Sequence, residues 1–243
     1  MSIRGIAHRG YPVKYPENTI SSFQAAIDLG FSHMELDVHL SKDGIPVVMH
    51  DHTIDRMTDG SGEIRMYTFE ELQHFKVAEN ERIPSLEEVL KMAKDRIIVS
   101  IELKNTELYR GVEKIVYDVI QKLGVVDQVY IISFNHKSLA KLRGLSKELE
   151  LGPLVNKIRS SNYRLIEKLN AKYFAVRYDG LKEKHIKRCK EMGIQLVAWK
   201  VNTLEHMQYI KRNPSILGTT DELEKYKECF QKDIHLEMEQ VII

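Results

Sequence analysis

Carboxylates alternate with apolar residues in two stretches that otherwise look like buried β-strands. Glu35 and Asp37 fall on alternate positions of residues 33–40, so both side chains share one face of that strand. Glu102 and Lys104 share a face of a later strand in the same way. Because bare carboxylates on a buried face are costly, the three acids predict a site that holds a cation. Their hard oxygen ligands suit Mg²⁺ or Ca²⁺, and Mn²⁺ also fits.

Two imidazoles and two fixed cations lie at the ends of such strands. His8 and Arg9 close the first strand-like stretch, and His50 closes the third. Histidine exchanges protons near neutral pH, whereas Arg9 and Lys104 suit a phosphate. Phosphodiester cleavage requires this combination, because a metal and cations screen the phosphoryl oxygens while two proton-transfer groups serve the attacking and leaving oxygens. Each motif alone is weak, but together they predict this chemistry.

Strand-like and helix-like segments alternate along the whole chain and would position these side chains. Short apolar runs rich in β-branched residues predict strands at 3–8, 33–40, 45–50, 96–104, 128–134, 149–155, 171–178, 194–201 and 216–219. Helical patterns lie at 18–29, 68–77, 85–94, 108–123, 137–146, 162–169, 181–192, 204–211 and 222–239. Repeated βα units over 243 residues predict a (β/α)8 TIM barrel, whose active site forms at the carboxyl ends of the strands. A doubly wound open sheet is the alternative, but no Gly-x-Gly-x-x-Gly follows the first strand.

The connection at residues 41–44 interrupts this pattern. Its four residues are too few for the crossover that a parallel pair needs, and Asp43-Gly44 favours a hairpin turn. The barrel should therefore be irregular near its second and third strands, with one strand candidate too many. Residues 51–84 then form a long connection, which we expect to be a small insertion within a single domain over residues 1–243.

Three helix starts carry capping residues. Thr68 and Ser85 are each followed three residues later by glutamate, which is the spacing of a capping box. Asn18 is expected to cap the first helix, and the alternative for the stretch Pro16-Glu17-Asn18-Thr19 is a contact with a substrate.

The charge balance and the lack of long apolar runs exclude several function classes. The chain has 36 Lys and Arg against 35 Asp and Glu, so its net charge of +1 offers no overall cationic field for nucleic acid or an anionic membrane. Residues 1–104 hold 12 basic and 17 acidic side chains, whereas residues 105–243 hold 24 and 18, so the later surface helices are expected to be basic. No run reaches the length of a membrane span or signal peptide, and the two cysteines lack zinc-ligand spacing. We expect a cytoplasmic protein with reduced thiols.

A series of short motifs also follows one another along nearly the whole chain. They are Ala7-His8-Arg9-Gly10, Pro16-Glu17-Asn18-Thr19, Glu35-Leu36-Asp37-Val38, Ser41-Lys42-Asp43-Gly44, Val47-Val48-Met49-His50-Asp51, Ile83-Pro84-Ser85-Leu86-Glu87-Glu88-Val89-Leu90, Ile101-Glu102-Leu103-Lys104, Ser133-Phe134, Trp199-Lys200-Val201-Asn202 and Thr220-Asp221. In content and order they resemble the bacterial glycerophosphodiester phosphodiesterase family.

The resemblance implies a (β/α)8 barrel that hydrolyses glycerophosphodiesters, such as glycerophosphocholine or glycerophosphoethanolamine, to sn-glycerol 3-phosphate and an alcohol. It implies one divalent metal ion on Glu35, Asp37 and Glu102, catalytic histidines at His8 and His50, and phosphate-binding cations at Arg9 and Lys104. Phe134 and Trp199 are core aromatics by default, and the resemblance adds a role as substrate-binding pocket walls. His39 shares the carboxylate face and is expected to hydrogen-bond near the site rather than to ligate the metal.

Two departures from the family pattern concern the far wall of the pocket. Lys200 replaces threonine in Trp-Thr-Val-Asn, and residues 212–219 differ from the usual run before Thr220-Asp221. Both bear on which alcohol is accepted. Three alternatives stay open, namely a lysophospholipase D, a phosphodiesterase that releases a cyclic phosphate, and a barrel that binds phosphodiesters without cleaving them. The identity of the metal, the division of base and acid between the histidines, direct water attack against a cyclic intermediate, and the oligomeric state also stay open.

Overall fold

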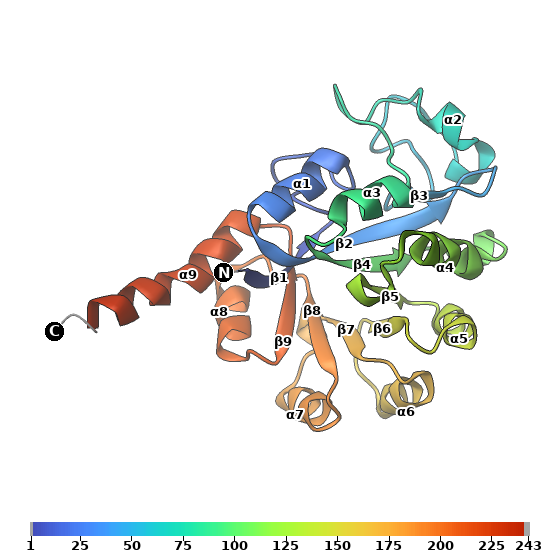
Figure 1. The fold of residues 1–243 in the computed structure, drawn as a ribbon. Coiled ribbons are helices and arrows are strands. Elements are labelled where there is room, and N and C mark those ends of the chain that lie inside the picture. The colour runs from blue at the N-terminus through green and yellow to red at the C-terminus, as the bar shows by residue number, and fades with distance from the viewer. Residues whose placement is uncertain (1, 241–243) are drawn as a thin grey trace.

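Parallel strands close into a barrel in the computed structural model, which describes residues 2–240, with side chains up to residue 231. The strands are β1 (Ile3–His8), β2 (Phe31–Leu40), β3 (Pro46–Val48), β4 (Ile98–Leu103), β5 (Val129–Ser133), β6 (Glu150–Val155), β7 (Tyr173–Arg177), β8 (Gln195–Trp199) and β9 (Ile216–Thr220). Within the described residues, eight strands pair in parallel in the order β1-β9-β8-β7-β6-β5-β4-β2, and pairing of β1 with β2 closes the ring (Figure 1). The predicted (β/α)8 barrel is confirmed, and its closure excludes the open sheet.

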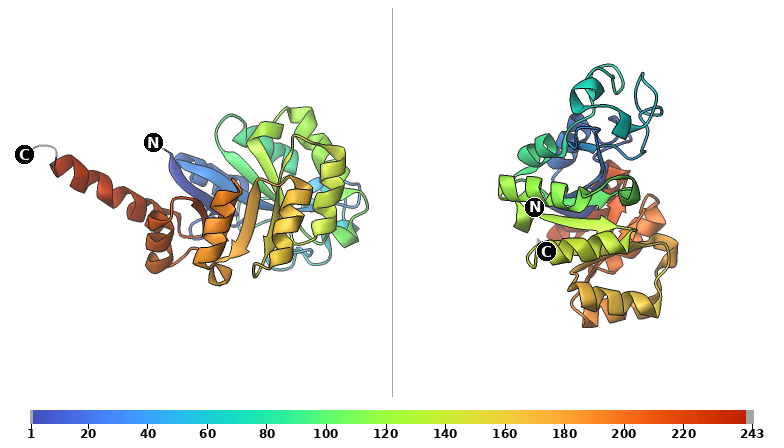
Figure 2. Two further views of the ribbon diagram at one scale, coloured as in Figure 1. Left: turned by 90° about the horizontal axis from the view of Figure 1, so that it is seen from below. Right: turned by 90° about the vertical axis from the view of Figure 1, so that its right-hand side faces the viewer.

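Helices connect the strands and cover the outside of the barrel (Figure 1). They are α1 (Ile20–Asp28), α2 (Phe69–Leu72), α3 (Leu86–Ala93), α4 (Val112–Leu123), α5 (His136–Leu145), α6 (Ser160–Leu169), α7 (Glu183–Glu191), α8 (Leu204–Arg212) and α9 (Leu223–Gln240), with short 3-10 turns at Ile64–Met66, Thr106–Leu108, Val126–Gln128 and Tyr178–Gly180. The last helix, α9, runs away from the barrel (Figure 2). None of the helices in the described part of the chain is long and apolar enough to cross a bilayer.

Both predicted capping boxes are present. The Thr68 and Ser85 hydroxyls each accept a hydrogen bond from the backbone N–H three residues on, and the glutamate there accepts one in return. Helix α2, however, ends at Leu72 instead of continuing to residue 77. Val77 instead makes isolated β-bridges with Thr58 and Glu81, a backbone pairing that a helical residue does not form.

The prediction that Asn18 caps the first helix was wrong. The hydroxyl of Thr19 is the cap of α1 and accepts the backbone N–H of Ser22 at 3.3 Å. Asn18 instead lies in a left-handed turn with φ of 59°. Its Nδ2 donates to Asp37 Oδ2 at 3.0 Å, so this side chain belongs to the polar end of the barrel.

Strands β2 and β3 form an antiparallel hairpin, as the turn at 41–44 predicted. Val38 pairs with Val48, and β3 is the extra strand outside the barrel. The chain from β3 to α3 packs around its own apolar cluster of Val47, Met49, Ile54, Ile64, Leu72, Val77 and Ile83. Figure 1 shows this segment as a lobe beside β3.

Apolar side chains fill the space on both sides of the barrel wall. On β2, Met34, Leu36 and Val38 are buried in the core that also contains Phe23 of α1. Inside the barrel lies a smaller cluster of Ile6, Tyr130, Ile132, Leu154, Ala175, Val197 and Leu217. The alternating polar residues of β2 point the other way from its apolar set, toward the barrel interior. The inner cluster therefore forms the floor beneath the polar strand ends.

Candidate active site

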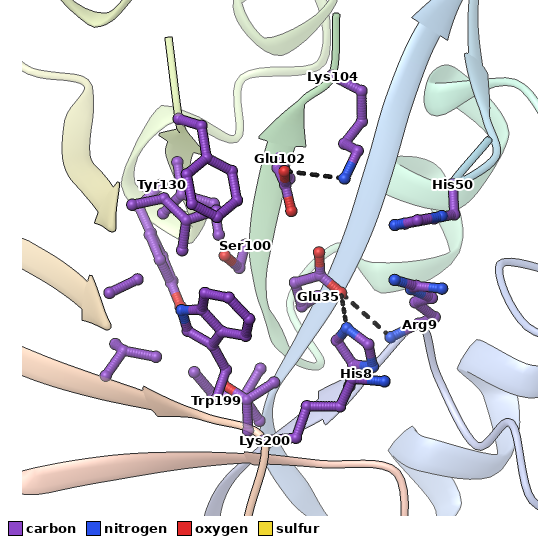
Figure 3. Close-up of a pocket in the computed structure, with 17 residues that line it drawn as sticks. His8, Arg9, Glu35, His50, Ser100, Glu102, Lys104, Tyr130, Trp199 and Lys200 are labelled. Atoms are coloured by element: carbon purple, nitrogen blue, oxygen red, sulfur yellow. Dashed lines mark hydrogen bonds and ion pairs between the residues drawn. The ribbon is translucent and has the colours of Figure 1, made fainter. Parts of the chain in front are cut away.

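A cavity of about 140 Å³ lies at the carboxyl ends of the strands (Figure 3). Of the nine predicted site residues, those that line it are His8, Arg9, Glu35, His50, Glu102, Lys104, Phe134 and Trp199. The remaining one, Asp37, has a carboxylate oxygen within 4.8 Å of oxygens from Glu35 and Glu102. The fold therefore brings all nine residues together.

The register between β2 and β4 gathers the three carboxylates. Asp37 is paired with Glu102 across the two strands, and Glu35 lies on the same face of β2. All three residues are buried. Burial and repulsion from the other two carboxylates raise the pKa of Glu35 well above its usual value. Burial, with repulsion from Asp37, raises the pKa of Glu102 to about 7.

The carboxylate cluster fits a divalent cation. Burial opposes the ionisation of Asp37, but Arg9 and Lys104 hold the pKa of its carboxyl below the usual value. Asp37 Oδ1 is buried and has no hydrogen-bond donor in the part of the chain that the structure describes. Lys104 Nζ lies 3.6 Å from it and 3.1 Å from Glu102 Oε1. An oxygen that lacks a donor, in an oxygen-only set whose members repel one another, is suited to a hard metal ion.

His8 is held at the end of β1 by a carboxylate from the far end of the chain. Its Nδ1 lies 2.6 Å from Asp221 Oδ1, just after β9. Its Nε2 lies 3.9 Å from Glu35 Oε2 (Figure 3). Burial lowers the pKa of His8, and Asp221 opposes that shift. Asp221 Oδ2 also accepts from Asn202 Nδ2 at 2.7 Å. Asp221 stands in one of the quoted motifs, but the sequence analysis gave it no role. It directly follows β9, which pairs with β1 in the closed barrel, and this position could have identified it as a neighbour of His8.

His50 is held by a second chain of charged groups. Its Nδ1 lies 2.6 Å from Asp51 Oδ1, and Asp51 Oδ2 accepts from Arg56 Nε at 2.6 Å. That hydrogen bond from Arg56, followed by the one from His50, lowers the pKa of Asp51 to about 2. Arg56 also donates to Glu17, which accepts from Arg9 at 3.0 Å. Sequence reasoning missed Arg56 and Glu17, although Glu17 stands in one of the quoted motifs.

A tight turn after β1 aims Arg9 at the carboxylates. Arg9 has φ of 57° and Gly10 has φ of 81°. A Cβ on Gly10 would lie 2.4 Å from Ser22 Oγ, so the turn needs glycine there. The turn directs the Arg9 backbone N–H to Glu35 Oε2 at 3.2 Å and places its Nε 3.2 Å from Asp37 Oδ2.

Phe134 and Trp199 form an aromatic wall opposite the carboxylates. Their rings meet edge to face, with centroids 5.9 Å apart and an angle of 88° between the planes. Trp199 Nε1 is buried without a hydrogen-bond partner among the described residues. Next to it, Lys200 lines the cavity and places Nζ 3.3 Å from Asp221 Oδ2.

His39 lies behind the site and supports it, as expected. Its Nε2 donates to the carbonyl oxygen of His50 at 3.0 Å, and its Nδ1 accepts from the Tyr109 hydroxyl at 3.0 Å. Both ring nitrogens are therefore engaged, and His39 fixes the backbone that carries the second histidine.

Three comparisons place the chain among known proteins. Residues 8–222 match the model of the glycerophosphoryl diester phosphodiesterase family. A glycerophosphodiester phosphodiesterase from Caldanaerobacter subterraneus is 35% identical over 212 residues, which cover 84% of this chain and 87% of that protein. The crystal structure of a glycerophosphodiester phosphodiesterase from Thermotoga maritima is 29% identical, with a TM-score of 0.76 over 92% of this chain and 96% of that one. A phosphodiesterase from Oleispira antarctica, in complex with the product sn-glycerol 3-phosphate, shares the fold at 24% identity, with a TM-score of 0.86 over 94% and 96% of the two chains. Because the family model matches most of the chain and the Caldanaerobacter protein is 35% identical, this chain belongs to the glycerophosphoryl diester phosphodiesterase family.

Proposed function

We propose that this barrel hydrolyses glycerophosphodiesters, such as glycerophosphocholine and glycerophosphoethanolamine, with one divalent metal ion and two histidines. Family membership makes the chain a glycerophosphodiester phosphodiesterase, and the proposal concerns how its residues do the work. The observation that carries it is the gathering of three carboxylates, His8 and His50 around one cavity.

Glu35, Asp37 and Glu102 would hold the ion, for which Mg²⁺ or Ca²⁺ is the first choice and Mn²⁺ also fits. When bound, such an ion polarises a phosphoryl oxygen and screens its charge. The local charge supports this assignment. Three ionised carboxylates against Arg9 and Lys104 leave one negative charge, and a divalent ion turns it into one positive charge. A phosphodiester, which carries one negative charge, then balances the site.

Arg9 and Lys104 bind the phosphoryl group in this scheme. Both side chains line the cavity and are largely shielded from water, so their attraction for an anion is weakly screened. The planar guanidinium of Arg9 suits paired phosphoryl oxygens, whereas the Lys104 ammonium acts as a point charge.

His8 and His50 move the protons. Each has Nδ1 hydrogen-bonded to a carboxylate, of Asp221 and Asp51 respectively, so Nε2 is the nitrogen left for the substrate. One imidazole takes the proton of the attacking hydroxyl, and the other protonates the oxygen of the leaving alcohol. The carboxylates keep each ring in the tautomer and orientation that this transfer needs.

Three further assignments belong to the proposal. Residues 1–243 form one domain with residues 51–84 as an insertion, which the separate apolar cluster of that segment supports. Phe134 and Trp199 contact the alcohol, as their place on the cavity wall supports. The protein acts in the cytoplasm on a small-molecule substrate, which its low cysteine content supports.

The test is a panel of glycerophosphocholine, glycerophosphoethanolamine and lysophosphatidylcholine, assayed after EDTA treatment and after each metal is restored. We expect release of sn-glycerol 3-phosphate that EDTA abolishes and a divalent ion restores. His8→Ala and His50→Ala should each lower kcat by about 10²–10⁴-fold. Near-wild-type rates in both variants would contradict the proposal. Cleavage of lysophosphatidylcholine alone would favour the lysophospholipase D alternative, and binding without turnover would favour a non-catalytic barrel.

A further inference from the structure

The cavity is too small to enclose a glycerophosphodiester with a large alcohol. Its volume of about 140 Å³ lies below the roughly 300–1,000 Å³ that is usual for small-molecule pockets. The carboxylates, Arg9 and Lys104 all come from the side formed by β1, β2 and β4, and the phosphoryl group goes there. The alcohol then extends over the opposite rim, where Phe134 is 46% exposed.

A groove continues from this rim over the loops that follow β6 and β7. Phe134 and Leu154 line both the cavity and the near part of the groove, and Lys157 lines both its near and its far part. The cations of this basic groove are Lys157, Arg159, Lys182, Lys184 and Arg188. Its lining carboxylate, that of Asp179, is bound to Arg177 at 2.6 Å. The groove therefore carries a large excess of positive charge.

Several of these cations are available to a ligand. Lys157, Arg159 and Lys182 are exposed and form no ion pair with a carboxylate among the side chains that the structure describes. Helix α6 begins in the same groove, at Ser160, and its N-terminus adds partial positive charge. Lys200, at the end of the neighbouring β8, lines the cavity itself, where it is paired with Asp221.

We propose that the basic groove binds a second phosphoryl group, carried by the alcohol half of the substrate. The preferred substrates are then glycerophosphodiesters whose alcohol bears a phosphate, and Lys157 and Arg159 are specificity-determining residues. This inference rests on the proposed function, because that function places the phosphoryl group of the substrate and so sets the direction in which the bound alcohol extends from it. A dianionic phosphate suits paired Lys and Arg side chains better than a neutral alcohol does.

The same groove works against a cationic alcohol. Choline carries a permanent positive charge, and beyond the Phe134 rim it meets Lys157 and Arg159, which form no ion pair with a carboxylate among the described side chains. Like-charge juxtaposition discriminates against such a partner. We therefore expect the order of preference to be a phosphorylated alcohol first, a neutral alcohol second and choline last.

The experiment compares kcat/KM for three diesters, each with the metal-loaded protein. They are glycerophosphoglycerol, the same diester with a phosphate on its far glycerol, and glycerophosphocholine. Wild type should prefer the phosphorylated diester over glycerophosphoglycerol by roughly tenfold or more, which corresponds to at least about 1.4 kcal/mol. Raising the salt concentration should shrink this preference, because exposed charges are screened.

The variant Lys157→Gln/Arg159→Gln removes two groove charges and keeps both side chains unbranched at Cβ and polar at their ends. It should lose most of the preference through a higher KM for the phosphorylated diester, with glycerophosphoglycerol hydrolysed within about twofold of wild type. The matched control is Arg164→Gln/Lys168→Gln, which removes the same charge from exposed positions of α6 that do not line the groove. It should keep the preference. A melting temperature for each variant checks that it folds.

Failure of this inference is distinguishable from failure of the proposed function. If glycerophosphoglycerol is hydrolysed in a metal-dependent manner but wild type shows no preference, the groove assignment is overturned and the proposed function stands. Equal loss in the groove and control variants also overturns the groove assignment, because it shows a general charge effect. If none of the three diesters is hydrolysed, both are overturned.

Discussion

Replacing Asp221 by asparagine should impair His8 without removing any of the proposed metal ligands. Asp221 Oδ1 lies 2.6 Å from His8 Nδ1, and this is the hydrogen bond that orients the imidazole. Asparagine keeps the size of the side chain but loses its charge, and its NH₂ group would face a ring N–H if it took the place of that oxygen. Asp221 therefore serves as a positioning residue for His8.

The size of the effect follows from that hydrogen bond. A hydrogen bond to a charged group contributes about 1.5–3 kcal/mol. Since each 1.36 kcal/mol corresponds to a tenfold change in rate, Asp221→Asn should lower kcat by roughly ten- to two-hundredfold. The loss should not exceed that of His8→Ala, because removal of the imidazole also removes whatever Asp221 does through it.

The assay is release of sn-glycerol 3-phosphate by both single variants and by the double variant. If Asp221 acts through His8, adding Asp221→Asn to His8→Ala should cost less than about twofold, so the two effects are strongly non-additive. Metal affinity should stay that of wild type. Two results would refute the reasoning: a near-wild-type kcat for Asp221→Asn, or an equal further loss in the His8→Ala background, which would reveal a general structural role.

Three further outcomes follow from the geometry. A divalent ion at about 100 times its Kd should add about 2.7 kcal/mol of stability and raise Tm by several degrees, and Glu102→Gln should abolish this rise in scanning calorimetry. Gly10→Ala should destabilise the protein by roughly 1–3 kcal/mol in chemical denaturation, because its Cβ would lie 2.4 Å from a neighbouring side chain, whereas Gly30→Ala, with φ of 85° and open space around the new Cβ, should cost less. Asp51→Asn should move the limb of the pH–rate profile that belongs to His50 to lower pH, because Asp51 raises the pKa of that imidazole against its burial; an unmoved limb would contradict the pairing.

Local patterns predicted most of the fold. The alternation of apolar, β-branched runs with helical segments predicted every strand of the barrel. Strands of a parallel sheet are buried on both faces, so each one consists of a nearly continuous run of apolar residues. The short turn at residues 41–44 identified the antiparallel hairpin for an equally local reason, since four residues cannot form a crossover. Element ends were less predictable. The third strand spans Pro46–Val48 instead of 45–50, because the following chain turns into the lobe.

Contacts between distant parts of the chain explain what the sequence did not reveal. His8 and Asp221 are 213 residues apart and meet because β1 pairs with β9 when the barrel closes. Arg56 reaches Glu17 across 39 residues, from the lobe to the loop after β1. Asn18 was predicted to cap α1 because asparagine is a common N-cap residue. It lies in a left-handed turn instead, and the next residue, Thr19, caps the helix. Residue types and spacing along one strand contain none of this information.

Barrel closure also explains how a chain with a net charge of +1 can carry a strongly polarised active site. The acidic excess of residues 1–104 includes the three carboxylates on β2 and β4, whereas the basic excess of residues 105–243 includes the groove cations that follow β6 and β7. In an open sheet these groups would lie along one edge. In a closed ring, β6 and β7 lie across the cavity from β1 and β2, so the two charge excesses face each other over the same opening. A diester with a phosphorylated alcohol can then place one phosphoryl group beside the metal ligands and the other on the basic groove, which is why the preference for such substrates tests the geometry of the whole mouth and not one residue alone.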